Sequence, residues 1–224
     1  LLQLYGMSEI VAWACFLQPD DHRRGLAGEE GILRSSGRFA TYADVKICDD
    51  DGNALPTGET GVIYIKSPMV MMAYLNLPKE TADVLSPDGW LKTNDIGKLD
   101  ANGFIYVLDR RNFLINTGGV NVFPASVEAV LGEHPHVLES AVVGMPHPEW
   151  GEAVVAAVVP RPGVGLSPED LRKDILRHCT RNLSKLEAPK HVEIMTELPR
   201  TITAKLHKRA LQEHFRKNVR FDWQ

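Results

Sequence analysis

The sequence lacks several features that would each assign it to a familiar class. It has only three cysteines, Cys15, Cys48 and Cys179. They are scattered and odd in number, which argues against a disulfide framework or a cysteine-based zinc site and suits the reducing cytosol. No run of about 18 apolar residues is present, so no segment is expected to span a bilayer. The first residues also lack a basic stretch and a small-residue cleavage site, so we expect no signal peptide.

A strong charge of either sign is also missing. The formal net charge is −4 over 224 residues, and the basic residues form no long stretch, which argues against a nucleic-acid partner. Hydrophobic residues make up 44% of the chain, which is enough for one large domain or two small ones. The chain opens on an apolar segment, Leu1 to Gly6, that predicts a buried strand ending in a tight turn. We therefore expect a fragment of a longer protein.

The first half of the chain is rich in strand and turn signals. Short β-branched and aromatic runs separated by Gly, Asn and Asp predict a small barrel or a strongly bent sheet. One short helix is expected over 77–84. The predicted strands are 45–48, 61–66, 90–92, 96–99 and 104–108.

The second half changes to an alternation of strands and helices. Helices are predicted over 126–131, 168–182 and 208–217. Strands are predicted over 140–143, 153–159 and 191–195. Ser167 is a suitable N-cap, followed by Pro168 at the first helical position and Asp170 three residues after the cap, as in a weak capping box.

Four short segments stand out along the chain. In order, they are Tyr5-Gly6-Met7-Ser8-Glu9, Thr93-Asn94-Asp95, Asp109-Arg110 with Thr117-Gly118-Gly119-Val120-Asn121-Val122-Phe123-Pro124, and Pro199-Arg200-Thr201-Ile202-Thr203-Ala204-Lys205. Together they resemble the adenylate-forming superfamily, which includes acyl-CoA synthetases, peptide-synthetase adenylation domains and beetle luciferases. The resemblance covers essentially all 224 residues.

The resemblance implies a mixed α/β (α+β) fold in two parts. Residues 1–111 would be the C-terminal part of the large adenylate-binding domain, with a β-barrel-like subdomain of short strands. Residues 112–224 would be a small, mobile α+β domain with a mixed sheet. The implied function is activation of a carboxylic acid by ATP as acyl-AMP, followed by transfer to coenzyme A, in the cytoplasm. The sequence leaves the acid and the oligomeric state open.

The resemblance also assigns roles to residues of the first part. Tyr5 would stack near the adenine and the Ser8 hydroxyl would touch the α-phosphate. Glu9 would ligate Mg²⁺, a role that suits a carboxylate. Asp95 would accept hydrogen bonds from both ribose hydroxyls, and Arg110 would reach the ribose or the phosphates. Gly6 and Val107 complete the implied nucleotide-binding set.

The remaining implied roles belong to the second part and to the hinge. Lys205 would be catalytic in the first half-reaction, because its ammonium can bridge the incoming carboxylate and the α-phosphate. Asn112 would be the pivot of a domain rotation between the half-reactions. Gly118 and Gly119 would then let the backbone lie beside the pantetheine arm of coenzyme A, since they have no side chains.

The sequence departs from the family pattern at several positions. Asn112 replaces the usual Asp or Lys of the hinge, and Phe113 replaces an acidic residue. Asn94 stands where the family has Gly, and so does Ala204. The Gly-rich, Ser/Thr-rich phosphate loop is absent, so we expect the 224-residue chain alone to show no adenylation.

Two alternatives remain beside the acyl-CoA ligase. The first is an acyl-AMP ligase that loads a carrier protein and does not use free coenzyme A. The second is a non-catalytic module that binds nucleotide weakly or binds only a partner. The segment 117–124 is more typical of medium-chain, fatty-acyl and aromatic acid CoA ligases than of peptide-synthetase domains.

Overall fold

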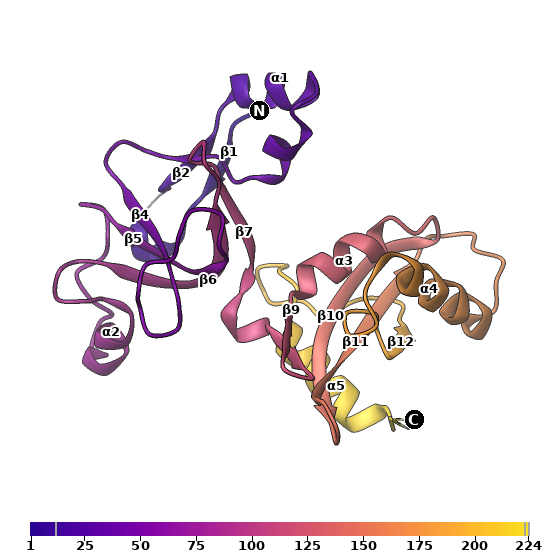
Figure 1. Ribbon diagram of the computed structural model, residues 1–224. Coiled ribbons are helices and arrows are strands. Elements are labelled where there is room, and N and C mark those ends of the chain that lie inside the picture. Colours follow the sequence, from indigo (N-terminus) through magenta and orange to yellow (C-terminus); the bar gives the residue numbers. More distant parts are fainter. Residues whose placement is uncertain (12, 222, 224) are drawn as a thin grey trace. The chain divides into compact units, whose positions relative to one another are not determined.

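The computed structural model describes residues 1–11, 13–221 and 223 of the chain. These residues form two compact units, Leu1–Asn112 and Phe113–Gln224, shown in indigo to magenta and in magenta to yellow in Figure 1. Each unit has its own sheets and its own core, so each is described separately.

The first unit begins with a three-stranded antiparallel sheet in the order β1-β2-β3. Its strands are β1 (Gln3–Tyr5), β2 (Cys15–Leu17) and β3 (Arg38–Phe39), with η1 (Ser8–Ile10), α1 (Pro19–Leu26) and η2 (Glu30–Arg34) along the connections. The sequence analysis did not predict α1. A Pro at its first position and a capping box between Gln18 and Asp21 start this helix, a signal that the sequence contains.

The expectation of a buried opening strand is wrong. Leu1, Leu2 and Leu4 are 91%, 46% and 38% exposed. The physical reason is that β1 pairs with β2 along one of its edges, and no second strand joins the other edge among the described residues. Apolar composition predicted the strand but could not predict what covers it.

A second sheet of the first unit is an antiparallel meander, β4-β5-β6-β7. It contains β4 (Asp44–Cys48), β5 (Gly61–Lys66), β6 (Leu91–Leu99) and β7 (Ile105–Arg110), and α2 (Pro78–Val84) precedes β6. Within the described residues no ladder joins β4 to β7, so this is an open sheet and not a closed barrel. Register shifts on both sides of β6 bend it, as β-bulges do.

The predicted break at Asn94-Asp95 is also wrong, because β6 runs through it as one strand. Asn94 takes a left-handed backbone conformation, with φ 61°, which Asn tolerates better than most residues. The strand therefore continues despite a tripeptide that looks like a turn. Similarly, β7 extends two residues beyond its predicted end, so Asp109 and Arg110 lie in the sheet.

The second unit is built on a mixed sheet, as predicted. The strands β10 (Val137–His147) and β11 (Gly151–Pro160) form a long antiparallel pair. The strand β12 (His191–Ile194) joins β11 in parallel, and the hairpin of β8 (Ile115–Thr117) and β9 (Val120–Val122) meets β11 at its start. The unit begins at Phe113, the last residue of η3 (Arg111–Phe113).

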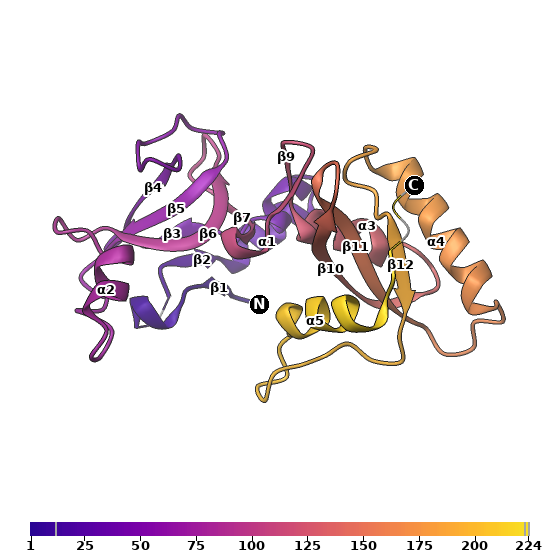
Figure 2. The same cartoon turned by 90° about the horizontal axis from the view of Figure 1, so that it is seen from below.

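Helices cover both faces of this sheet, as Figures 1 and 2 show. The helices α3 (Pro124–Gly132) and α4 (Pro168–Asn182) lie on one face, and α5 (Lys208–Asn218) lies on the other. Alternate residues of β11 divide between the two cores. Val154, Ala156 and Val158 pack with α3 and α4, and Val155, Ala157 and Val159 pack with Leu211 and Phe215 of α5. Burial on both faces explains why β11 is a continuous apolar run.

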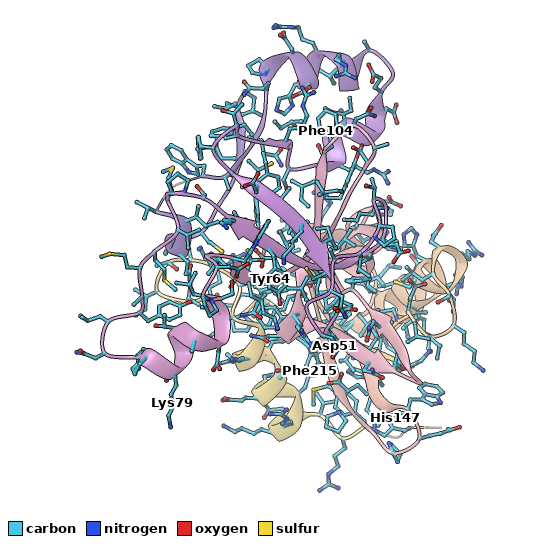
Figure 3. All side chains as sticks on the ribbon, turned by 60° about the vertical axis from the view of Figure 1, so that its left-hand side comes forward. Asp51, Tyr64, Lys79, Phe104, His147 and Phe215 are labelled. Carbon is cyan, nitrogen blue, oxygen red and sulfur yellow. The ribbon has the colours of Figure 1, made fainter. Side chains whose placement is uncertain are left out.

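Several predicted elements match the structure closely. The strand over 61–66 and the helix over 168–182 have the predicted bounds. The Ser167 hydroxyl accepts a hydrogen bond from the Asp170 backbone N–H at 3.1 Å, so the expected N-cap is confirmed. Figure 3 labels Phe104 in the first unit and Phe215 on α5, both of which are buried in their own cores.

Candidate functional site

The first unit places a buried carboxylate, Asp95, in the middle of β6. Asp95 is only 6% exposed. Thr93 prepares the position: its hydroxyl donates to the Ile63 carbonyl at 2.9 Å and accepts from the Asp95 backbone N–H at 3.1 Å. Asn94, which lies between Thr93 and Asp95, has a left-handed backbone conformation that lets the chain turn locally inside β6. The predicted ribose ligand is therefore held by a rigid backbone.

Two other predicted site residues bind the two oxygens of this carboxylate. The Tyr5 hydroxyl donates to Asp95 Oδ2 at 2.7 Å. Arg110, which pairs with Asp95 across the β6–β7 ladder, places Nε 3.3 Å from Oδ1. Residues 5, 95 and 110 are far apart in the sequence, so the fold alone brings them together. A carboxylate has about four lone-pair sites, and these two contacts leave capacity for further donors.

Burial and electrostatics oppose each other at Asp95. Burial raises the pKa of the carboxyl above its ordinary value, and the nearby Glu9 charge adds to this. The Tyr5 hydrogen bond and the Arg110 charge lower the Asp95 pKa and so favour the ionised form. Burial and the Asp95 charge in turn raise the pKa of Tyr5 far above its ordinary value, which keeps Tyr5 a hydrogen-bond donor.

Glu9, the predicted magnesium ligand, is held by a residue that the sequence analysis did not select. The Tyr74 hydroxyl donates to Glu9 Oε1 at 2.8 Å, and the Glu9 carbonyl accepts from the Met71 N–H at 2.7 Å. Burial and this hydrogen bond raise the pKa of Tyr74 to about 12. Tyr74 lies 65 residues from Glu9, so no local sequence signal could have linked them.

The other predicted site residues of the first unit are Gly6, Ser8, Val107 and Asn112. Gly6 and Ser8 are exposed, and Ser8 begins η1 after Gly6 and Met7, which follow β1. Val107 pairs with Gly97 beside the bulge of β6. Asn112 lies in the short helix η3 and is the last residue of the first unit.

Lys205 belongs to the second unit, at the end of an exposed hairpin loop. The Thr201 N–H donates to the Lys205 carbonyl at 2.7 Å, and the Lys205 N–H donates to the Thr201 hydroxyl at 3.2 Å. Arg200, missed by the sequence analysis, donates to the Ala204 carbonyl at 3.0 Å and to Glu139 of β10 at 2.7 Å. Ala204 is left-handed, with φ 61°, which explains why the family prefers Gly there.

Gly118 and Gly119 form the two-residue turn between β8 and β9. Both have positive φ, 58° and 80°, as a turn of this kind requires. The Gly118 N–H donates to the Trp150 carbonyl at 2.9 Å. Glu152 also contacts β8: its carboxylate accepts a hydrogen bond from the Asn116 N–H at 2.9 Å. The turn is therefore fixed to the start of β11.

The described residues contain no group of three or more His, Cys, Asp or Glu side chains placed to hold a metal ion. Proteins usually bind Mg²⁺ through one or two carboxylates with phosphate oxygens and water, so such a group is not required for the role expected of Glu9. Glu9 fits such a role as a single carboxylate. Over the same residues, no helix is both long enough and apolar enough to cross a membrane.

Comparison with known proteins gives a family match for each part of the chain. Residues 1–75 match the AMP-binding enzyme family, and residues 126–205 match the AMP-binding enzyme C-terminal domain. The chain is 38% identical over 216 residues to the medium/long-chain-fatty-acid–CoA ligase FadD8 of Mycobacterium tuberculosis, which covers 95% of this chain and 37% of the relative. The chain thus spans well under half the length of this relative.

Solved structures show the same relationship. The amide bond synthetase McbA from Marinactinospora thermotolerans superposes with a TM-score of 0.84 and 39% identity, covering 96% of this chain and 42% of that one. The o-succinylbenzoate coenzyme A synthetase MenE from Bacillus subtilis, in complex with ATP and magnesium ion, gives 0.78 and 34%, covering 92% and 40%. These likenesses define the class as adenylate-forming. The chain belongs to the AMP-binding enzyme family.

Proposed function

We propose that the protein containing this chain is an acyl-CoA ligase that activates a carboxylic acid with ATP and transfers it to coenzyme A. The observation that carries the proposal is the buried Asp95 carboxylate with Tyr5 and Arg110 on its two oxygens. A carboxylate acceptor held in this way suits the two vicinal hydroxyls of a ribose. Arg110 is 66% exposed in its side chain, so its guanidinium remains available to an anionic ligand.

The remaining residues follow from the order of the chemistry. In the first half-reaction the acid attacks the α-phosphorus of ATP and pyrophosphate leaves, so two anions must approach each other. Ser8 and Arg110 bind the nucleotide. Lys205 supplies positive charge where negative charge develops. Glu9 would hold Mg²⁺, which would supply charge to neutralise the phosphates, and Tyr74 orients Glu9 through its hydrogen bond.

In this proposal the second half-reaction uses a different part of the second unit, the turn between β8 and β9. The backbone at Gly118-Gly119 lies beside the pantetheine arm of coenzyme A, and rotation at Asn112 exchanges this turn for Lys205. Residues 1–111 are the end of the large adenylate-binding domain, and residues 112–224 are the mobile small domain. Because Asn112 is neutral where the family has a charged residue, the pivot here depends on no ion pair of its own.

The test is carboxylate-dependent pyrophosphate exchange in the complete polypeptide, comparing Lys205→Ala with Lys217→Ala. Removal of a group that stabilises charge in the transition state typically lowers the rate on the order of 10²–10³-fold. We expect Lys205→Ala to lower the exchange rate by a factor in this range. Lys217 is exposed near the end of α5, and its replacement serves as the matched loss of one cation. Equal rates in the two variants would refute the role of Lys205.

The acyl acceptor needs a separate measurement, because one solved relative is an amide bond synthetase. The acyl-adenylate formed by the complete polypeptide is offered free coenzyme A, a carrier protein and a primary amine in parallel. Thioester formation on coenzyme A supports the ligase. If the carrier protein or the amine is acylated and no coenzyme A thioester forms, the acyl acceptor is that compound and not coenzyme A. No exchange with any of a broad panel of acids would favour a non-catalytic module.

A further inference from the structure

Two aromatic residues that follow α5, Phe221 and Trp223, form a tail that packs onto the core of the second unit. Phe221 and Trp223 pack against the cluster that contains Phe215 and Leu211 of α5. Phe221 also meets the His191 ring edge-on, with centroids 5.4 Å apart. The two tail rings stack on each other at 4.5 Å and 5°. One end of this short segment is therefore anchored to α5 and β12.

The other end of the tail meets His147, the last residue of β10, which Figure 3 labels. The Trp223 and His147 ring centroids are 5.1 Å apart. His147 also stacks on Trp150, with the ring centroids 4.4 Å apart and an angle of 9° between the ring planes. His147 Nδ1 also accepts from the N–H groups of Glu149 and Trp150, both at 3.1 Å. His147 is thus held both by rings and by the turn that follows β10.

Trp150 extends this chain of contacts to the glycine turn. Its carbonyl accepts the Gly118 N–H at 2.9 Å, and the next residue, Gly151, pairs with Thr117 of β8. The contacts from Phe221 through Trp223, His147 and Trp150 to Gly118 are continuous and lie within one unit. The Phe221–Trp223 and His147–Trp150 pairs are stacked, and the Trp223 ring is tilted by 53° to the His147 ring; aromatic pairs add to the energy of apolar burial and depend on ring orientation.

We propose that the tail, through Trp223, is a positioning element that fixes the Gly118-Gly119 turn by clamping His147 against Trp150. The proposal rests on the proposed function only where it concerns coenzyme A: a turn held in one geometry would present the backbone to the pantetheine arm without a further ordering cost. Adenylation does not depend on this turn. The two half-reactions should therefore respond differently to a change in the tail.

The experiment compares Trp223→Leu with Trp223→Phe in the complete polypeptide. Leu keeps an apolar side chain but no flat ring, whereas Phe keeps the ring. Asn218→Ala, at the exposed end of α5, is the control for a change near the tail outside the ring stack. Amide hydrogen exchange of the peptide spanning 114–122, the KM for coenzyme A and the rate of carboxylate-dependent pyrophosphate exchange are measured for each variant.

We expect Trp223→Leu to speed hydrogen exchange in 114–122 and to raise the KM for coenzyme A by roughly two- to tenfold, the range that an aromatic pair energy corresponds to. Pyrophosphate exchange should stay close to the parent rate, and Trp223→Phe and Asn218→Ala should resemble the parent throughout. Equal hydrogen exchange in the Leu and Phe variants would overturn the proposal, as would a parallel loss in both half-reactions.

A second variant keeps the test decisive if Trp223→Leu does not fold. His147→Asn removes the ring at the middle of the chain but keeps a side-chain oxygen that can accept the two turn amides. It should reproduce the faster hydrogen exchange in 114–122, and an unchanged rate would overturn the clamp. If the parent protein does not acylate coenzyme A at all, the proposed function fails, and the hydrogen-exchange comparison still decides the role of the tail.

Discussion

Replacing Tyr5 by Phe removes one hydroxyl from the buried centre and leaves the ring. The lost contact is a 2.7 Å hydrogen bond to the Asp95 carboxylate, and hydrogen bonds to charged groups contribute about 1.5–3 kcal/mol. The Tyr5–Asp95 pair is largely buried, so solvent screening reduces this value little. We therefore expect Tyr5→Phe to lower the free energy of unfolding of the chain by an amount in that range at neutral pH.

The loss should depend on pH in a defined direction. Burial already raises the pKa of Asp95 in the folded state, and the Tyr5 hydrogen bond lowers it. Removing Tyr5 therefore moves the folded-state pKa of Asp95 further above its unfolded value. Such a group contributes stability below its unfolded pKa, and this contribution is lost as the pH rises through the folded pKa. The deficit of Tyr5→Phe should thus be largest at neutral pH and shrink in acid.

The assay is denaturant unfolding at neutral and acidic pH, together with a carboxyl NMR titration of Asp95. Tyr106→Phe is the matched control, because the Tyr106 hydroxyl also donates to a carboxylate, Asp100, at the longer distance of 3.2 Å. Asp100 is half-buried, whereas Asp95 is buried, so we expect a smaller loss in the control. An equal deficit at both pH values, or an Asp95 pKa that does not rise, would refute the reasoning.

Four further substitutions test local features of the two units. Ala204→Gly should raise the free energy of unfolding by about 1 kcal/mol in melting experiments, since it removes a Cβ from a left-handed position; a loss would contradict the strain. Thr117→Val should also raise the free energy of unfolding by about 1 kcal/mol, because the buried Thr117 hydroxyl has no hydrogen-bond partner among the described residues. Thr93→Val should lower it, because the Thr93 hydroxyl makes two hydrogen bonds. Equal effects of the two substitutions would refute this distinction. Gly97→Ala should cost about 1–3 kcal/mol by denaturant unfolding, since a Cβ there would lie 2.6 Å from the Tyr106 carbonyl oxygen; a neutral result would show that β7 can shift.

The sequence alone determined much about this protein. Periodicity and capping signals located β5 and α4 with their observed bounds, because these signals act between neighbours in the chain. The four motifs identified the family, because the residue types that the chemistry requires recur in a fixed order. They also selected Tyr5, Asp95 and Arg110, which the fold does bring together.

Only the tertiary structure decided the rest. The ladder of β6 with β5 and β7 carries the strand through Asn94-Asp95, overriding local turn signals, because neighbouring strands supply the backbone hydrogen bonds. Tyr74 was not foreseen because its partner Glu9 lies 65 residues away. The exposure of Leu1 was likewise invisible to a count of apolar residues, since burial depends on what packs against a strand and not on its composition alone.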